Sequence, residues 1–167
     1  MNVVIEKATP ADAEALLSYL KQIGGESDNL TFGSEGVPFS VEAEAEYLLQ
    51  REQSTDGIVL VAKENGMIIG TASLDRLPRR MRHRGELGIS VLKAYQNRGI
   101  GRRLITEILS YARDNEFSVI DLQVRCDNSA AVHLYETMGF EICGVHPAFF
   151  QIGEETVPFY MMYRNIP

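Results

Sequence analysis

Apolar residues recur along the chain at two spacings, which separate the expected strands from the expected helices. Over residues 86–92 they alternate with small or polar residues, which is the two-residue period of a strand. Over residues 99–115 they fall three and four positions apart, on one face of a helix. The same patterns predict strands at 3–5, 58–62, 67–72, 119–124, 140–150 and 156–163, and helices at 10–23, 40–49 and 129–138.

Cap and turn residues stand at the boundaries of these elements. Thr9 and Ser40 are suited to cap the first two helices, because a short hydroxyl side chain can accept a hydrogen bond from the first turn. Asn65-Gly66 predicts a two-residue hairpin turn, and Gly139 is expected to end the last helix. Residues 24–39, rich in Gly, Ser, Asp and Asn, are expected to form a long loop, a kind of segment that is often functional.

The predicted order of elements is β-α-α-β-β-β-α-β-α-β-β. A strand, a crossover helix and a second strand place 86–92 beside 119–124 in parallel, with antiparallel strands before and after them. The continuous apolar run at 119–124 is typical of an inner strand. The expected fold class is therefore α/β, with a mixed sheet in a single layered domain over residues 1–167.

Composition narrows the classes of function. The chain has 167 residues, of which 45% are hydrophobic without a run long enough to span a membrane, so we expect one soluble globular domain. The first ten residues lack the basic and apolar blocks of a signal peptide. A formal net charge of −7 argues against nucleic acid or an anionic membrane as the partner.

Cysteines and histidines add no chemistry of their own. Cys126 and Cys143 are expected to be reduced thiols of a cytoplasmic protein, and burial suits Cys126 better than a nucleophilic role. His83, His133 and His146 lie too far apart for metal-ligand spacing, so we predict no metal site. The acidic run at 42–46 and the basic connector at 78–84 are expected to be solvated surface.

The segment Gln96-Asn97-Arg98-Gly99-Ile100-Gly101 joins a predicted strand to a predicted helix. Two glycines let the backbone approach a ligand closely, and the first N–H groups of a helix attract a phosphate. The alternatives are a plain turn and a dinucleotide site, although the GxGxxG spacing fails because position 104 is Leu. Spacing alone leaves a phosphate site and a plain turn both open.

Three stretches together resemble the GCN5-related N-acetyltransferase (GNAT) superfamily. The first is GELGISVLKAYQNRGIGRRL, whose Gln96-x-x-Gly99-x-Gly101 is similar to the family's pyrophosphate-binding motif. The second is DNSAA, with Asn128 where the family often has Asn, and the third is LYETMGF, similar to the family's LYEKxGF signature. The resemblance covers nearly the whole chain, although the family often has an acidic residue where VPF stands at 157–159.

The resemblance implies acetyl-CoA as the donor and an amine as the acceptor. It implies that backbone N–H groups of the glycine turn bind the pyrophosphate. The pantetheine arm would pair with a strand edge left open where two parallel strands splay apart. A bulge near Ser90 would direct the Val91 N–H at the thioester carbonyl, where it stabilises the oxyanion. The implied cofactor-binding residues are Ile89, Val91, Gln96, Asn97, Arg98, Gly99, Ile100, Gly101, Arg102, Asn128 and Tyr135.

Glu86 is the candidate for the catalytic base. The acceptor arrives as an ammonium ion and must lose a proton before it attacks, so a carboxylate on the central strand would act directly or through water. Glu86 is expected on the same strand face as Gly88 and Ser90. The alternative is an ion pair with Arg84 or His83 at the end of the strand.

Tyr135 is the candidate for the catalytic acid. It matches the residue that, in the resembled family, gives a proton to the departing CoA thiolate, whereas its spacing fits an aromatic of the helix core equally well. Asn128 is a helix cap, a cofactor contact or both.

The leading hypothesis is an N-acetyltransferase that transfers the acetyl group directly in a ternary complex, because no nucleophile is evident. A non-catalytic sensor that binds CoA is the alternative, and a dinucleotide-binding oxidoreductase fits the glycine spacing poorly. The resemblance leaves a homodimer open.

The acceptor amine is undetermined: a small molecule or a protein N-terminus would both fit. In the resembled family the acceptor is set here by residues 24–39 and 147–155. Glu26, Asp28 and Glu35 could receive a cation such as a polyamine, an aminoglycoside or an amino-acid amine, or could simply be solvated.

Overall fold

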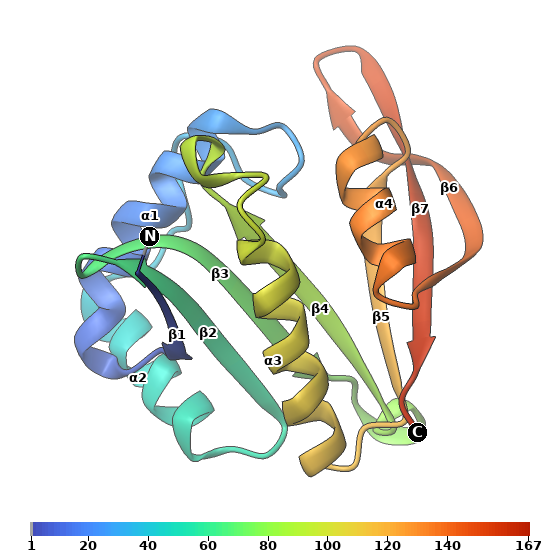
Figure 1. Ribbon diagram of the computed structural model, residues 1–167. Coiled ribbons are helices and arrows are strands. Elements are labelled where there is room, and N and C mark those ends of the chain that lie inside the picture. Colours follow the sequence, from blue (N-terminus) through green and yellow to red (C-terminus); the bar gives the residue numbers. More distant parts are fainter. Residues whose placement is uncertain (1) are drawn as a thin grey trace.

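The computed structural model describes residues 2–167 and follows the predicted order of elements (Figure 1). The strands are β1 (Val3–Lys7), β2 (Gly57–Glu64), β3 (Met67–Arg76), β4 (Arg84–Val91), β5 (Val119–Arg125), β6 (Glu141–Ile152) and β7 (Glu155–Asn165). The α-helices are α1 (Ala13–Glu26), α2 (Val41–Gln53), α3 (Ile100–Asp114) and α4 (Ser129–Thr137), and the 3₁₀ turns are η1 (Pro10–Asp12), η2 (Arg79–Met81) and η3 (Lys93–Tyr95).

Across residues 2–167 the strands form one mixed sheet of seven, in the order β1-β2-β3-β4-β5-β7-β6. β4 and β5 are the parallel neighbours, and the remaining pairs are antiparallel. The α/β class and the mixed sheet are therefore confirmed. The β2–β3 hairpin turns at Asn65 and Gly66, both with positive φ, as the turn signal predicts.

Helices cover both faces of the sheet (Figure 1). Successive residues of β4 point to opposite faces. Ser90 meets Tyr19 of α1, and a Cβ on Gly101 of α3 would lie 3.9 Å from Ile89. α1 and α2 therefore cover one face, and α3 covers the other. The predicted apolar stripe of α3 is buried: Ile100, Leu104, Ile105, Ile108, Leu109 and Ala112.

The first helix begins and ends later than its sequence predicts. Thr9 and Asp12 form a capping box around η1, and α1 follows from Ala13. α1 then continues through Gly24 to Glu26, so the loop predicted from residue 24 begins at Ser27. A Cβ on Gly24 would lie 2.0 Å from the carbonyl oxygen of Gly33. This glycine therefore serves close packing between helix and loop and does not mark the helix end.

One expectation about exposure is wrong. Glu44 was expected on a solvated face, but it is buried because it lies one turn from Leu48 on the side of α2 that packs inward, and burial raises the pKa of its carboxyl. β5 is an inner strand between β4 and β7, as expected; its Ile120, Leu122 and Val124 are buried, and the residues between them are partly exposed. In the connector at 78–84, residues 78–83 are exposed, as expected, and Arg84 is partly exposed.

Candidate active site

The pairing between β4 and β5 ends partway along the two strands. Among the described residues, β4 pairs with β5 at Arg84↔Val119, Gly85↔Ile120 and Glu86↔Asp121, and pairs with β3 along its whole length. Figure 1 shows the two strands starting together and separating toward the start of α4. The predicted splay is therefore present, and the edge of β4 at residues 87–91 that β5 leaves without a strand partner is called the notch.

Backbone N–H groups of β4 face this notch. The Leu92 N–H donates to the Ile69 carbonyl of β3 over 2.9 Å. Because the direction of the backbone groups alternates along a strand, those of Val91 and Ile89 point away from β3. The Val91 carbonyl accepts a hydrogen bond from Gln96 Nε2 at 3.2 Å. The Val91 N–H therefore points toward the space that β5 has left.

The bulge expected near Ser90 is absent. The pairing of β3 with β4 stays in register from Gly70↔Val91 to Arg76↔Gly85. Simple alternation already directs the Val91 N–H into the notch, so the strand needs no extra residue to turn it.

The glycine turn brings the start of α3 to the open end of β4. Asn97 and Gly99 have positive φ, and α3 begins directly after them at Ile100. A Cβ on Gly99 would meet no heavy atom within 4 Å, so this side of the turn is open. A Cβ on Gly101 would instead lie 3.2 Å from Leu134 of α4. Glycine is therefore needed at the two positions for different reasons. Gly99 has a left-handed backbone, and Gly101 lies where α3 packs closely against α4.

The three arginines of this segment, Arg98, Arg102 and Arg103, each contact a different part of the protein. Arg102 donates to Thr137 Oγ1 over 2.9 Å and to the sulfur of Met138 over 3.1 Å, both at the end of α4. Arg103 donates to the Val3 carbonyl, and the Arg98 guanidinium stacks over the Tyr95 ring at 5.2 Å from its centroid. Arg102 thus ties α3 to α4 at the rim of the notch.

Asn128 and Tyr135 come from α4. The Asn128 side chain accepts a hydrogen bond from the Ala131 N–H, so the predicted helix cap is formed. Tyr135 packs edge-on against Phe140 and is 8% exposed, which fits the interpretation of its spacing as part of the core. Burial raises the pKa of Tyr135, and its hydroxyl therefore keeps its proton at neutral pH.

Glu86 is exposed at the closed end of the notch. It lies between Asp75 of β3 and Asp121 of β5 in the pairing, and shares the α1 face with Ser90 as expected. The nearby Arg84 donates a hydrogen bond from Nε to Asp121 Oδ2 over 2.8 Å. Arg84 is therefore paired with Asp121, and this contact takes the place of the alternative ion pair with Glu86.

A buried tyrosine that the apolar pattern places on the inward face of α1 carries a polar contact. The Tyr19 hydroxyl lies 2.9 Å from Ser90 Oγ, which lies 3.3 Å from Thr71 Oγ1. Burial raises the pKa of Tyr19 to about 12. The signal in the sequence was a tyrosine on an apolar stripe, because a buried phenol needs a hydrogen-bond partner.

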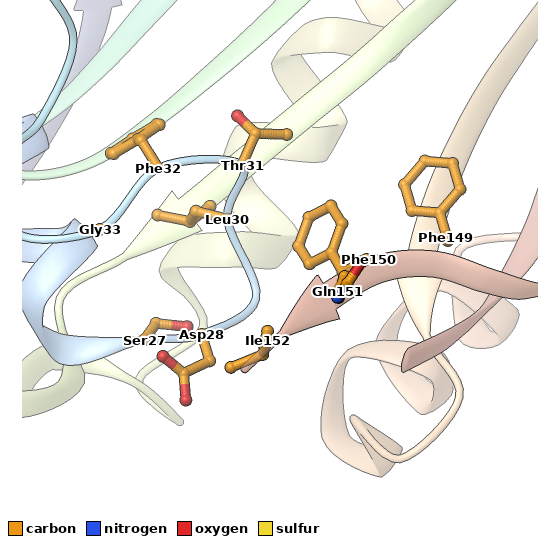
Figure 2. Close-up of a pocket in the computed structure, with 10 residues that line it drawn as sticks. All are labelled: Ser27, Asp28, Leu30, Thr31, Phe32, Gly33, Phe149, Phe150, Gln151 and Ile152. Carbon is orange, nitrogen blue, oxygen red and sulfur yellow. The ribbon is translucent and has the colours of Figure 1, made fainter. Parts of the chain in front are cut away.

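The loop between α1 and α2 meets the β6–β7 hairpin across a cavity of about 350 Å³ (Figure 2). These are the two segments in which the resemblance places the acceptor. Phe150 projects from β6 toward the loop, with Phe149 beside it. The cavity is lined by Ser27, Asp28, Leu30, Thr31, Phe32, Gly33, Phe149, Phe150, Gln151 and Ile152.

Two other observations bear on ligands. A second hollow of about 470 Å³ lies beside β1 and the ends of α2 and α3, and none of the expected site residues lines it. Within residues 2–167, no three His, Cys, Asp or Glu side chains are grouped so that they could hold a metal ion.

Among the helices of residues 2–167, none is both long and apolar enough to cross a bilayer.

Residues 28–140 match the family model of the acetyltransferase (GNAT) family. The chain belongs to the GNAT family. It is 40% identical over 92 residues to the N-alpha-acetyltransferase RimI of Mycobacterium tuberculosis, covering 54% of this chain and 56% of that protein. It is 33% identical over 91 residues to the L-amino acid N-acyltransferase MnaT of Escherichia coli, covering 53% of each. The chain thus spans about half the length of these curated relatives.

Solved structures extend the likeness to the whole GNAT fold. An acetyltransferase of the GNAT family from Streptococcus pneumoniae superposes with a TM-score of 0.95 at 31% identity, covering 99% of this chain and 100% of that one. A putative acetyltransferase from Salmonella typhimurium, solved with acetyl-CoA, has the same fold, with a TM-score of 0.86 at 22% identity over 100% of this chain and 95% of that one. The family and its N-acetyltransferase members support an acyltransferase.

Proposed function

We propose that the protein transfers an acetyl group from acetyl-CoA to a primary amine, directly, in a ternary complex. The observation that carries the proposal is the interrupted pairing of β4 with β5. It leaves the Val91 and Ile89 backbone facing the notch, beside the glycine turn that begins α3. An N-acetyltransferase relative supports the class of reaction.

The residues of the notch fit acetyl-CoA. The open side of Gly99 and the first N–H groups of α3 suit a pyrophosphate, which Gln96, Asn97, Arg98, Gly99, Ile100, Gly101 and Arg102 would surround. Ile89 and Val91 would pair with the amides of the pantetheine arm as a missing strand would. Asn128 and Tyr135 would contact the arm from α4. When bound, the thioester supplies an activated acetyl group.

The Val91 N–H would stabilise negative charge on the thioester carbonyl as the amine attacks. A donor already aimed at such an oxygen is worth about 3 kcal/mol of the barrier. The rigid pairing of β4 with β3 holds this donor in place, so the strand need not rearrange during the reaction.

Tyr135 and Glu86 would carry out the two proton transfers of the reaction, one to the departing thiolate and one from the ammonium. A neutral tyrosine hydroxyl donates to the departing thiolate, and the raised pKa of Tyr135 keeps that donor protonated. Glu86 would take the proton of the ammonium, directly or through water, because its carboxylate is exposed and Arg84 is paired with Asp121. The cytoplasmic location and the homodimer stay predictions.

The test is to measure CoA binding and acetyl-CoA turnover on the same preparation. Calorimetry with CoA gives binding, and thiol release over a panel of small amines, amino acids and peptides gives turnover. We expect both binding and an amine-dependent release of thiol. Binding of CoA with no release above background for any amine would favour the sensor, and absence of CoA binding would reject both functions.

A further inference from the structure

The cavity between the α1–α2 loop and the β6–β7 hairpin has an aromatic wall. The rings of Phe149 and Phe150 lie 5.6 Å apart, and each lies 4.5 Å from the ring of Phe159 on β7. Leu30 and Phe32 of the loop also line the cavity, with their side chains directed away from these rings (Figure 2). Such a wall suits a ligand with an apolar body, because aromatic rings bury large areas at little cost in side-chain entropy.

Of the acidic residues at the end of α1 and in the loop, Glu26 and Glu35 are engaged in hydrogen bonds within the fold. Glu26 accepts hydrogen bonds from the Lys93 N–H and from Gln22. Glu35 accepts one from the Gly33 N–H, which lowers the pKa of its carboxyl. Asp28 is the charged residue among those that line the cavity. The cavity therefore lacks the several carboxylates that a polyamine or an aminoglycoside would need.

The cation next to the cavity is also committed. Arg125 donates through Nε and Nη2 to both carboxylate oxygens of Asp127, each over 2.9 Å, and through Nη1 to the Asp28 carbonyl over 3.2 Å. This fork neutralises the guanidinium and fixes the loop to the end of β5. A carboxylate entering the cavity would meet Asp28 and aromatic rings, and would lose its hydration without gaining a cation.

We infer that the acceptor is a primary amine with an apolar body and no carboxylate beside the amine. The inference rests on the proposed function and names the class of its second substrate. The apolar body packs against Phe149 and Phe150, and Asp28 at the edge of the cavity repels an acid. A free monoamine and the first residue of a peptide share this chemistry, whereas a free amino acid does not.

The experiment compares phenylalanine, phenylalaninamide, 2-phenylethylamine and a short peptide that begins with Phe, at saturating acetyl-CoA. We expect kcat/KM for phenylalaninamide to exceed that for phenylalanine by about tenfold or more, the usual cost of burying an unpaired charged group. A peptide that equals the amide identifies a polypeptide N-terminus as the source, and a peptide that is rejected identifies a monoamine. Equal or faster acetylation of phenylalanine, or a preference for spermidine, would overturn the inference.

Variants test the walls separately. Phe150→Ala should raise KM for phenylalaninamide by about tenfold through lost apolar contact, with KM for acetyl-CoA unchanged. Val145→Ala is the matched control, since Val145 is an exposed apolar residue of the same strand outside the cavity lining. Asp28→Arg should narrow the preference for the amide over the acid. An unchanged preference in Asp28→Arg, or an equal effect of both alanine variants, would contradict the assignment.

Failure of the two proposals can be told apart. If phenylalanine is acetylated as well as its amide, acetyl transfer stands and the inference about the acceptor is wrong. If no amine of any class is acetylated while CoA binds, the proposed function is itself wrong, and the inference falls with it.

Discussion

The two ends of the β4–β5 pair differ in whether their backbone groups are hydrogen-bonded between the strands. At the closed end the strands are paired, and Arg84 bridges to Asp121 at 2.8 Å. There the core is tight enough that a Cβ on Gly85 would lie 2.7 Å from the Phe117 ring, over which Arg76 stacks at 3.8 Å from the centroid. The contacts at this end of the pair therefore stabilise the fold.

At the open end the pairing stops, and the described part of β5 gives residues 87–91 of β4 no strand partner. The Val91 N–H faces the notch, and Ser90 directly before it is held by Tyr19 and Thr71. Backbone groups left without a strand partner must be met by water or by a ligand. Under the proposed function, the amides of the pantetheine arm would pair with these groups, and α1, from an earlier part of the chain, holds the strand through the contact of Tyr19 with Ser90.

The largest effect is expected at the open end, from Tyr135→Phe. Loss of a general acid should lower kcat by about 100-fold, with the affinity for CoA unchanged, because the ring and its packing remain. Stopped-flow thiol release and calorimetry measure the two quantities.

Tyr111→Phe serves as the control for a lost phenol away from the notch. Its hydroxyl donates to the Ser54 and Gly57 carbonyls, so its loss should cost about 1 kcal/mol of unfolding free energy and leave turnover unchanged. Full turnover in Tyr135→Phe would mean that its hydroxyl only fills the core.

A next, smaller effect is expected from Gly99→Ala, which tests whether the glycine turn meets a ligand. Gly99 and Gly66 both have positive φ, and a Cβ at either position would meet no heavy atom within 4 Å, so alanine should cost about 1–2 kcal/mol of stability at each. Only Gly99→Ala should also weaken CoA binding, by about tenfold, or 1.4 kcal/mol. Equal CoA affinity in the two variants would show that the turn binds no phosphate.

A several-fold loss of kcat is expected from Tyr19→Phe, as a positioning effect on Val91. Removing the contact with Ser90 should raise the activation barrier for turnover by about 1 kcal/mol and leave KM for acetyl-CoA unchanged. Ser90→Ala should have a similar effect, and the double variant should lose little more, because both act through one contact. Losses that add fully would place the two residues in separate roles.

The stability of Tyr19→Phe against pH gives an independent readout. The folded pKa of Tyr19, about 12, lies above its ordinary value because the phenol is buried. Its contribution to stability is therefore complete below pH ~10 and is lost as the pH rises toward the folded pKa. The stability difference between wild type and variant should narrow over that alkaline range, as denaturant titrations would show.

The smallest effect is expected at the closed end, from Asp121→Asn. It weakens a partly exposed ion pair with Arg84, so the unfolding free energy should fall by about 1 kcal/mol or less, and CoA affinity should stay unchanged. A large loss of CoA affinity in this variant would mean that the two ends of the pair are coupled and that they do not have separate roles.

Much of this architecture follows from short stretches of sequence. The order of elements, the buried stripe of α3, the Asn65-Gly66 turn and the cap at Asn128 each depend on residues within a few positions of one another. The α1 boundary and Glu44 were predicted wrongly, because packing against Gly33 and alongside Leu48 decided them. Motif resemblance supplied the candidate roles of Tyr135 and Glu86, which periodicity alone left open.

By itself, then, the sequence determined where strands and helices form and which turn begins α3, since hydrogen-bond periodicity and capping act between near neighbours. Only the tertiary structure decided where β4 and β5 part, that Tyr19 meets Ser90 across 71 positions, and that Arg125 holds the Asp28 loop across 97. These contacts depend on how whole layers pack, and no local spacing of residues encodes that packing.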